Sequence, residues 1–304
     1  MPAPLVAQVR VRAALLSVAV SLGLLALKFV AYFLTGSAAI LSDAAESVVN
    51  VLAANIALIS LVVASRPPDA GHRYGHGKAE YVSSASEGAM ILLAGAVAIV
   101  NGVRRLVRPV PLVDLPLGVG LVALAAAVNY LVARWLLGIS RTQDSAALEA
   151  DARHLFADVL TSVAVIAGLG LQLSTNLVWL DPLVGIAVGG HILRMGVEVY
   201  RGSLAGLMDA PLPEAEEATV RGILADHAEE IVDYHALRTR KAGRDRFIDL
   251  HLVLHRALLV GQAHALCDDL EAHIRAALPH TDITIHVEPC GPACPRCGRV
   301  AARA

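Results

Sequence analysis

Long runs of apolar residues, separated by short polar segments, dominate the first two-thirds of the chain. A helix that crosses a bilayer needs about 20 mostly apolar residues. Six segments meet this requirement: 11–34, 38–64, 82–103, 115–138, 145–172 and 177–200. The first is longer than the roughly 7–15 apolar residues of a cleavable signal peptide. We therefore expect it to stay in the protein as the first membrane helix.

After Met208 the pattern becomes mixed and polar. Residues 213–227 and 262–277 have helical patterns, and residues 231–240, 246–255 and 282–288 have strand patterns. In the second strand, Ile248, Leu250, Leu252 and Leu254 alternate with polar or aromatic residues, as in a strand with one buried face. The sequence predicts three parts: a six-helix membrane domain (1–208), a small α+β sandwich (209–290) and a cysteine-containing tail (291–304).

Composition agrees with a membrane protein, because 56% of the residues are hydrophobic and the mean hydropathy is +0.60. The net charge of −2 gives no indication of nucleic acid binding. Lys and Arg near helix ends predict which side is cytoplasmic. These residues favour cytoplasmic N- and C-termini in a multi-pass protein of the cell membrane, although three arginines at 104, 105 and 108 fall on the other side.

Two polar stripes interrupt the apolar segments. The second segment carries Asp43, Glu46 and Asn50, and the fifth carries Asp151, His154 and Asp158. In each, the spacing i, i+3, i+7 places the three residues on one helix face. Charged groups in a membrane span cost several kcal/mol each, so the stripes need a function. If the two stripes face each other, they could bind a cation between them. The alternative is that these residues cap helix ends or hydrogen-bond to one another.

Glu46, Asn50, His154 and Asp158 offer three oxygen donors and one imidazole, a set that suits four-coordinate zinc. The two carboxylates would neutralise a divalent ion. Asp43 and Asp151 lie nearer the segment ends, where an entrance or capping role is expected.

Two further groups of ligand-type residues lie outside the spans. Asp69, His72 and His76 share a short glycine-rich loop, where metal binding and a purely structural role are both open. In the C-terminal part, histidines and acids recur on the predicted strands and helix, which favours a metal site. The candidates there are His235, His251, His264, His286 and Glu288. Three thiols lie at the C-terminal end: Cys290 closes the predicted α+β part, and Cys294 and Cys297 are in the tail. They could bind zinc or belong to a flexible segment.

Five stretches give the chain a specific resemblance to a known family. They read LSDAAESVVN, PPDAGHRYGHGKAE, DARHLFAD, LRTRKAGRDRFIDLHL and IHVEP. The sequence resembles the cation diffusion facilitator family, in particular its bacterial zinc/iron branch of homodimeric, proton-coupled exporters. The resemblance implies a metallochaperone-like, ferredoxin-like C-terminal domain, and it implies that the three groups above are a transport site, a loop site and a cytoplasmic site. It also implies a charge interlock between protomers at Lys78 and Asp209.

One departure from that branch concerns the metal. Its second span usually carries two aspartates one turn apart, where this chain has Glu46 and Asn50. We expect a transporter, not an enzyme, that exports a divalent metal, zinc first, in exchange for protons by alternating access, without a catalytic cofactor. Two other hypotheses are a non-transporting membrane metal sensor or scaffold and an intramembrane metalloenzyme. The metalloenzyme hypothesis is disfavoured because the chain has no H-E-x-x-H motif.

Overall fold

The computed structural model describes residues 3–35, 38–108, 116–175, 179–292 and 294. The chain forms two compact units, Met1–Leu207 and Met208–Ala304, which we call the helical unit and the C-terminal unit. Some side chains within the helices also lie outside the description, among them those of Asp43 and Glu46.

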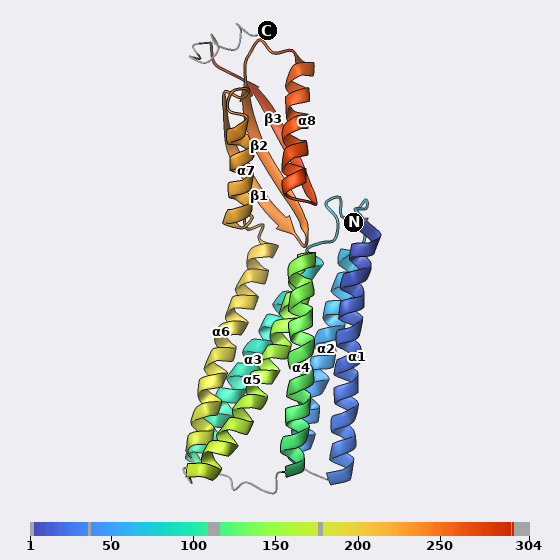
Figure 1. Cartoon of the computed structure of the whole chain (residues 1–304), viewed down its shortest axis with the longest axis vertical. Helices are drawn as coiled ribbons and strands as arrows, with labels where there is room; N and C mark the ends of the chain where they lie inside the picture. The colour runs from blue at the N-terminus through green and yellow to red at the C-terminus, as the bar shows by residue number, and fades with distance from the viewer. Residues whose placement is uncertain (1–2, 36–37, 109–115, 176–178, 293, 295–304) are drawn as a thin grey trace. The chain divides into compact units, whose positions relative to one another are not determined.

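Six helices of 27–33 residues make up the helical unit (Figure 1). They are α1 (Ala3–Thr35), α2 (Ala38–Ala64), α3 (Ala79–Val107), α4 (Pro116–Gln143), α5 (Ala146–Thr175) and α6 (Leu180–Leu207). Each predicted span falls mainly within one of them. Four described stretches, in α1, α3, α4 and α6, are long and apolar enough to cross a membrane, and the described part of α2 adds a shorter apolar stretch. The helical membrane-type fold is therefore confirmed, while the number of six crossings stays a prediction.

Glycines let α3 and α6 pack with their backbones close together. A Cβ added at Gly95 would lie 2.9 Å from the backbone nitrogen of Leu193, and one added at Gly88 would lie 2.8 Å from that of Tyr200. On α6, a Cβ added at Gly196 would lie 2.9 Å from the backbone nitrogen of Leu92. Small residues of this kind are what membrane helices use to approach one another.

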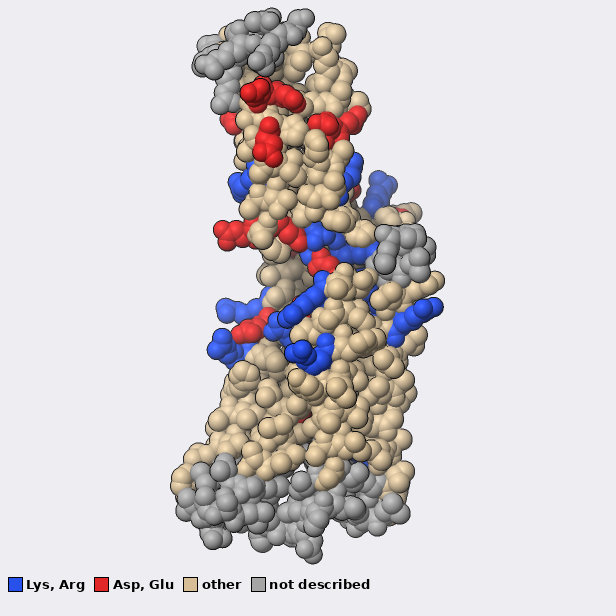
Figure 2. Space-filling model, viewed as in Figure 1, with Lys and Arg blue, Asp and Glu red and all other residues tan. Residues whose placement is uncertain are grey.

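The outer surface of the helical unit suits lipid. On the face shown in Figure 2 its flank is almost entirely uncharged over the described residues, and Lys and Arg gather at one of its ends. Exposed apolar side chains such as Leu52, Ile59, Leu93 and Leu131 cover the flanks of α2, α3 and α4. In water such a surface would be unfavourable, whereas in a bilayer it is what is required.

The C-terminal unit is a three-stranded sheet with two helices. Its elements are α7 (Glu214–Asp226), β1 (Asp233–Ala242), β2 (Asp245–Leu254), α8 (Val260–Ala277) and β3 (Thr281–Pro289), and the strand order is β1-β2-β3. β1 and β2 form an antiparallel hairpin, and β3 joins β2 in parallel after the α8 crossover. The predicted order of helix, two strands, helix and strand is confirmed, with boundaries shifted by one to two residues at most ends.

Both helices cover the same face of this sheet. Val220 and Leu224 of α7, and Leu270 and Ile274 of α8, form one buried cluster with the β2 leucines. Ile248, Leu250, Leu252 and Leu254 are each no more than 2% exposed, which confirms the predicted alternation of β2. The residues between them, His251 included, therefore belong to the opposite face of the sheet.

Candidate metal sites

Side chains from α2 and α5 meet inside the helical unit. Asn50 Oδ1 lies 3.1 Å from His154 Nε2, and Asn50 Nδ2 donates a hydrogen bond to Asp158 Oδ2. His154 and Asp158 are one turn apart on α5, so both reach the same α2 residue. His154 is 3% exposed. One amide, one imidazole and one carboxylate thus meet, with the imidazole buried and Asn50 and Asp158 partly buried.

Of the remaining residues of the two stripes, only Asp151 has a described side chain. Glu46 lies one turn before Asn50 on α2, and Asp43 one turn before that, but both side chains lie outside the described residues. Asp151 is 1% exposed, and its Oδ2 has no hydrogen-bond partner within the described structure.

A further buried acid, which we did not anticipate from the sequence, stands near Asp151. Glu87 of α3 is completely buried, its Oε2 has no hydrogen-bond partner within the described structure, and it interacts electrostatically with Asp151. Glu80, also on α3, is completely buried and forms an ion pair with Arg10 of α1. Glu80 and Glu87 are seven residues apart and therefore share a helix face, a pattern that the sequence displays. The sequence does not show, however, that Arg10 is the partner of Glu80.

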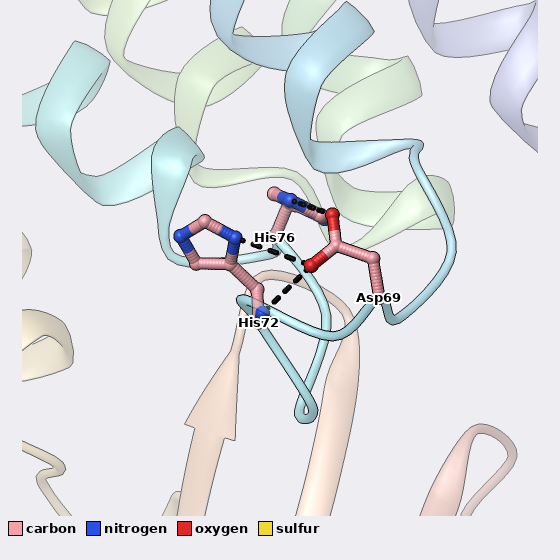
Figure 3. A group of neighbouring side chains, drawn as sticks. All are labelled: Asp69, His72 and His76. Carbon is pink, nitrogen blue, oxygen red and sulfur yellow. Dashed lines mark hydrogen bonds and ion pairs between the residues drawn. The ribbon is translucent and has the colours of Figure 1, made fainter.

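The loop between α2 and α3 gathers the second group of ligands (Figure 3). Asp69 Oδ1 lies 3.5 Å from His72 Nδ1, and Asp69 Oδ2 lies 3.3 Å from His76 Nε2. The two imidazole rings are 4.5 Å apart between centroids. These three residues therefore present ligand atoms within 4.8 Å of one another.

Backbone hydrogen bonds hold the loop in this shape. The N–H groups of Gly71 and His72 donate to Asp69 Oδ1 at 2.9 and 2.7 Å, an Asx-type turn. Gly75, with φ of +80°, supplies the left-handed residue that lets its N–H return to the His72 carbonyl. The hydrogen bond from the His72 N–H is also the main reason why the pKa of Asp69 is lowered. Asp69 thus stays ionised, as a metal ligand must be.

Three histidines lie in register across the sheet of the C-terminal unit. His235 of β1 is opposite His251 of β2, and His251 is opposite His286 of β3. Glu288 lies on the same strand face as His286, 2.8 Å from His251 Nδ1 and 3.6 Å from His235 Nε2. His235, His251 and Glu288 bring their ligand atoms together, and His286 is adjacent, with its ring centroid 4.8 Å from that of His251.

His264, the fifth residue predicted for this group, lies apart from it. It is on α8, the helix that covers the opposite, leucine-lined face of the sheet, and its Nε2 lies 3.7 Å from Asp268 Oδ2 on the same helix. Within the described chain it is not in the cluster of His235, His251 and Glu288. Strand alternation could not have shown this, because it does not say which face the following helix covers.

The last predicted residues have local partners. Lys78 Nζ donates to the Leu207 carbonyl at 3.1 Å, and Asp209 accepts from Arg240 at 3.4 Å. Cys290 is buried at the end of β3, and Cys294 is partly exposed. Cys297 lies outside the described residues.

Sequence models of protein families match both units. Residues 14–208 match the cation efflux transmembrane domain, and residues 212–290 match the cytoplasmic domain of cation efflux proteins. These two matches cover most of the chain.

Two individual transporters match over most of the chain. The chain is 38% identical over 276 residues to an uncharacterized transporter of Synechocystis sp., with 91% of this chain and 89% of that protein covered. It is 30% identical over 293 residues to the cation-efflux pump FieF of Salmonella typhi, with 95% of each covered. The solved metal-bound C-terminal domain of the CzcD transporter from Thermotoga maritima is 24% identical, with 26% of this chain and 92% of that chain covered and a TM-score of 0.24. The chain therefore belongs to the cation efflux, or cation diffusion facilitator, family of membrane transporters, whose members are not enzymes.

Proposed function

We propose that this protein exports a divalent metal ion, with zinc as the first candidate, in exchange for protons. The observation that carries the proposal is the meeting of Asn50, His154 and Asp158 between α2 and α5. Glu46, one turn from Asn50 on α2, is proposed as the fourth ligand. An imidazole with carboxylate and amide oxygens suits zinc, and iron(II), cobalt, cadmium and manganese are its competitors.

Charge explains why such a site belongs in a membrane. The carboxylates of Glu46 and Asp158 balance the two charges of the ion, so the loaded site is roughly neutral and costs less to hold in a low-dielectric setting. Metal ligands must lose their protons before they bind. Imidazole changes its protonation near physiological pH, which makes His154 the best candidate for returning a proton to the emptied site.

Transport then follows from alternating access. With both termini in the cytoplasm, metal enters from that side, past the buried acids Asp151 and Glu87, and displaces protons. Rearrangement of the helices opens the site outward, where a proton from outside replaces the metal. The loop of Asp69, His72 and His76 is proposed to deliver the ion.

The C-terminal unit is proposed to regulate this cycle. Metal bound by His235, His251 and Glu288, with His286 alongside, would stabilise a homodimer and bias the helical unit towards its active state. Lys78 and Asp209 are proposed to join the two protomers by charge. In this scheme the C-terminal unit senses metal and does not carry it.

A direct test is zinc flux in proteoliposomes with simultaneous recording of internal pH. The wild-type protein should move zinc with a counterflow of protons, and the His154→Ala/Asp158→Ala variant should not. His191→Ala is the matched control, because it removes an exposed histidine from α6. Equal flux in wild type and the double variant would reject the assigned site.

A second candidate function is a metal sensor on a transporter frame, since Asn50 replaces the carboxylate that the zinc/iron branch usually has. This hypothesis predicts metal binding by the C-terminal unit and no flux of any divalent metal in the same liposomes.

A further inference from the structure

A fourth cluster of ligand-type residues lies on the helices of the C-terminal unit, outside the three sites described above. His227 follows the last residue of α7, and Asp269 and His273 are one turn apart on α8. Asp269 Oδ2 lies 3.2 Å from His227 Nε2 and 3.6 Å from His273 Nδ1. The two imidazole centroids are 5.2 Å apart. All three ligand atoms fall within 4.8 Å of one another.

One hydrogen bond orients the first histidine for metal binding. His227 Nδ1 lies 2.9 Å from the carbonyl oxygen of Ile223, on the preceding turn of α7. A carbonyl only accepts, so Nδ1 carries the proton and Nε2 of the neutral ring has its lone pair directed at the cluster. Histidines that bind metals are commonly held in this way by a bond from the other ring nitrogen.

We propose that His227, Asp269 and His273 form a metal site in the C-terminal unit that takes a divalent cation of borderline character, such as zinc. Two imidazoles and a carboxylate are a common zinc ligand set. A cation also explains why two imidazoles converge on a single carboxylate, because two protonated histidines at this distance would repel each other.

The fourth position can be filled from the same segment or by water. The turn after α7 returns the Glu230 N–H to the His227 carbonyl at 2.9 Å, and Glu230 interacts electrostatically with the His227 ring. The Glu230 carboxylate is therefore near the first of the three ligands, His227. With Asp269 and Glu230 both ionised, a divalent ion would be neutralised.

This site is separate from the histidine row of the sheet. α7 and α8 cover the leucine-lined face, whereas His251 and its neighbours belong to the other face. Metal bound by His227 and by the two α8 residues would join the end of α7 to α8. The expected effect is a stabilised helical layer, independent of the ion that is transported.

The test measures zinc bound to the purified full-length protein by equilibrium dialysis. The Asp269→Asn/His273→Ala variant leaves the His227–Ile223 bond in place. It should bind one zinc ion fewer per chain, or bind it roughly tenfold or more weakly. Asp268→Asn is the matched control, since it removes the neighbouring carboxylate of α8 and leaves the cluster whole. Wild-type zinc binding in the double variant would overturn the proposal and would mean that these residues form only ion pairs.

Amide hydrogen exchange gives a second readout that does not depend on transport. Zinc should slow exchange in the last turn of α7 in the wild type and in Asp268→Asn, and should leave it unchanged in the double variant. Zinc protection that persists in the double variant would also reject the site. Neither measurement involves flux. A failed transport assay would therefore not affect the conclusion about this site, and a failure of zinc binding here would not affect the proposed transport function.

Discussion

The side-chain amide of Asn50 on α2 donates a hydrogen bond to the carboxylate of Asp158 on α5. The other atom of the same amide, Oδ1, lies 3.1 Å from His154. An ionised aspartate at position 50 could not donate to Asp158, and two ionised carboxylates in contact would repel each other. The neutral amide therefore lets the metal-free site close without taking up an extra proton.

Asn50→Asp should change the proton balance of metal binding. The new carboxylate would share a proton with Asp158 in the empty site, so zinc should release more protons on binding than it does from the wild type. Calorimetry of zinc binding in buffers of different ionisation enthalpy measures this number. Asn55→Asp, on the same helix but bonded to the Val51 carbonyl, is the control. Unchanged proton release in Asn50→Asp would argue against a role for this residue in the site.

Removing Arg10 should destabilise the helical unit strongly. Arg10 is 3% exposed and forms an ion pair with Glu80, which is fully buried. Arg10→Ala would leave that charge without its cation, at a cost of about 3–5 kcal/mol. Thermal unfolding in detergent should show a large fall in the melting temperature.

Arg194→Ala provides the comparison for Arg10→Ala, because Arg194 is 79% exposed and its ion pair with Glu198 spans one helical turn. A surface pair of this kind contributes about 0–1 kcal/mol. Equal losses in the two variants would show that burial does not control the energy of these pairs.

Gly95→Leu should separate α3 from α6. The new Cβ would stand 2.9 Å from the backbone nitrogen of Leu193 and 3.0 Å from the carbonyl oxygen of Gly189. Both contacts are to backbone atoms, so rotating a neighbouring side chain would not relieve the clash. The expected result is little folded protein in size-exclusion chromatography. Gly138→Leu on α4 meets no atom within 4 Å and should be neutral or stabilising by up to about 1 kcal/mol. Normal yield of Gly95→Leu would contradict the close approach.

The ion pair between Glu216 and Arg246 should make the C-terminal unit sensitive to acid. Arg246 donates to both Glu216 oxygens at 2.8 and 2.7 Å, and these bonds are the main reason why the pKa of Glu216 is lowered. A carboxyl whose pKa is lower when folded stabilises the fold above its unfolded pKa of about 4.3. That stabilisation is lost as the pH falls through the folded pKa.

Glu216→Gln should therefore lower the stability of the unit by about 1 kcal/mol at neutral pH. The difference from wild type should shrink as the pH falls below about 4, where Glu216 is itself protonated. Amide hydrogen exchange in α7, followed from neutral pH to below about pH 4, measures the loss of stability and its dependence on pH. Glu214→Gln, an exposed residue two positions earlier on α7, should show no such trend. A constant difference at all pH values would mean that the ionised pair is not what stabilises α7.

Much of the fold could be read from the sequence because periodicity reports which face of each element is apolar. The apolar runs predicted the helices, and the alternation around His251 predicted the buried leucines of β2. The spacing of Asn50 on one helix, and of His154 and Asp158 on another, predicted two polar stripes. Each of these properties depends on a single segment and its own repeat.

The tertiary structure alone decided which segments meet. It brought Asn50 to His154 and Asp158 across about 100 residues of chain, gave Glu80 its partner Arg10, and joined His227 to Asp269 and His273. It also put His264 on the helix over the leucine-lined face and away from the histidine row. The physical reason is that a repeat of two or of 3.6 residues fixes the direction of a side chain from its own backbone. It carries no information about which other face lies opposite, because packing of the whole chain determines that.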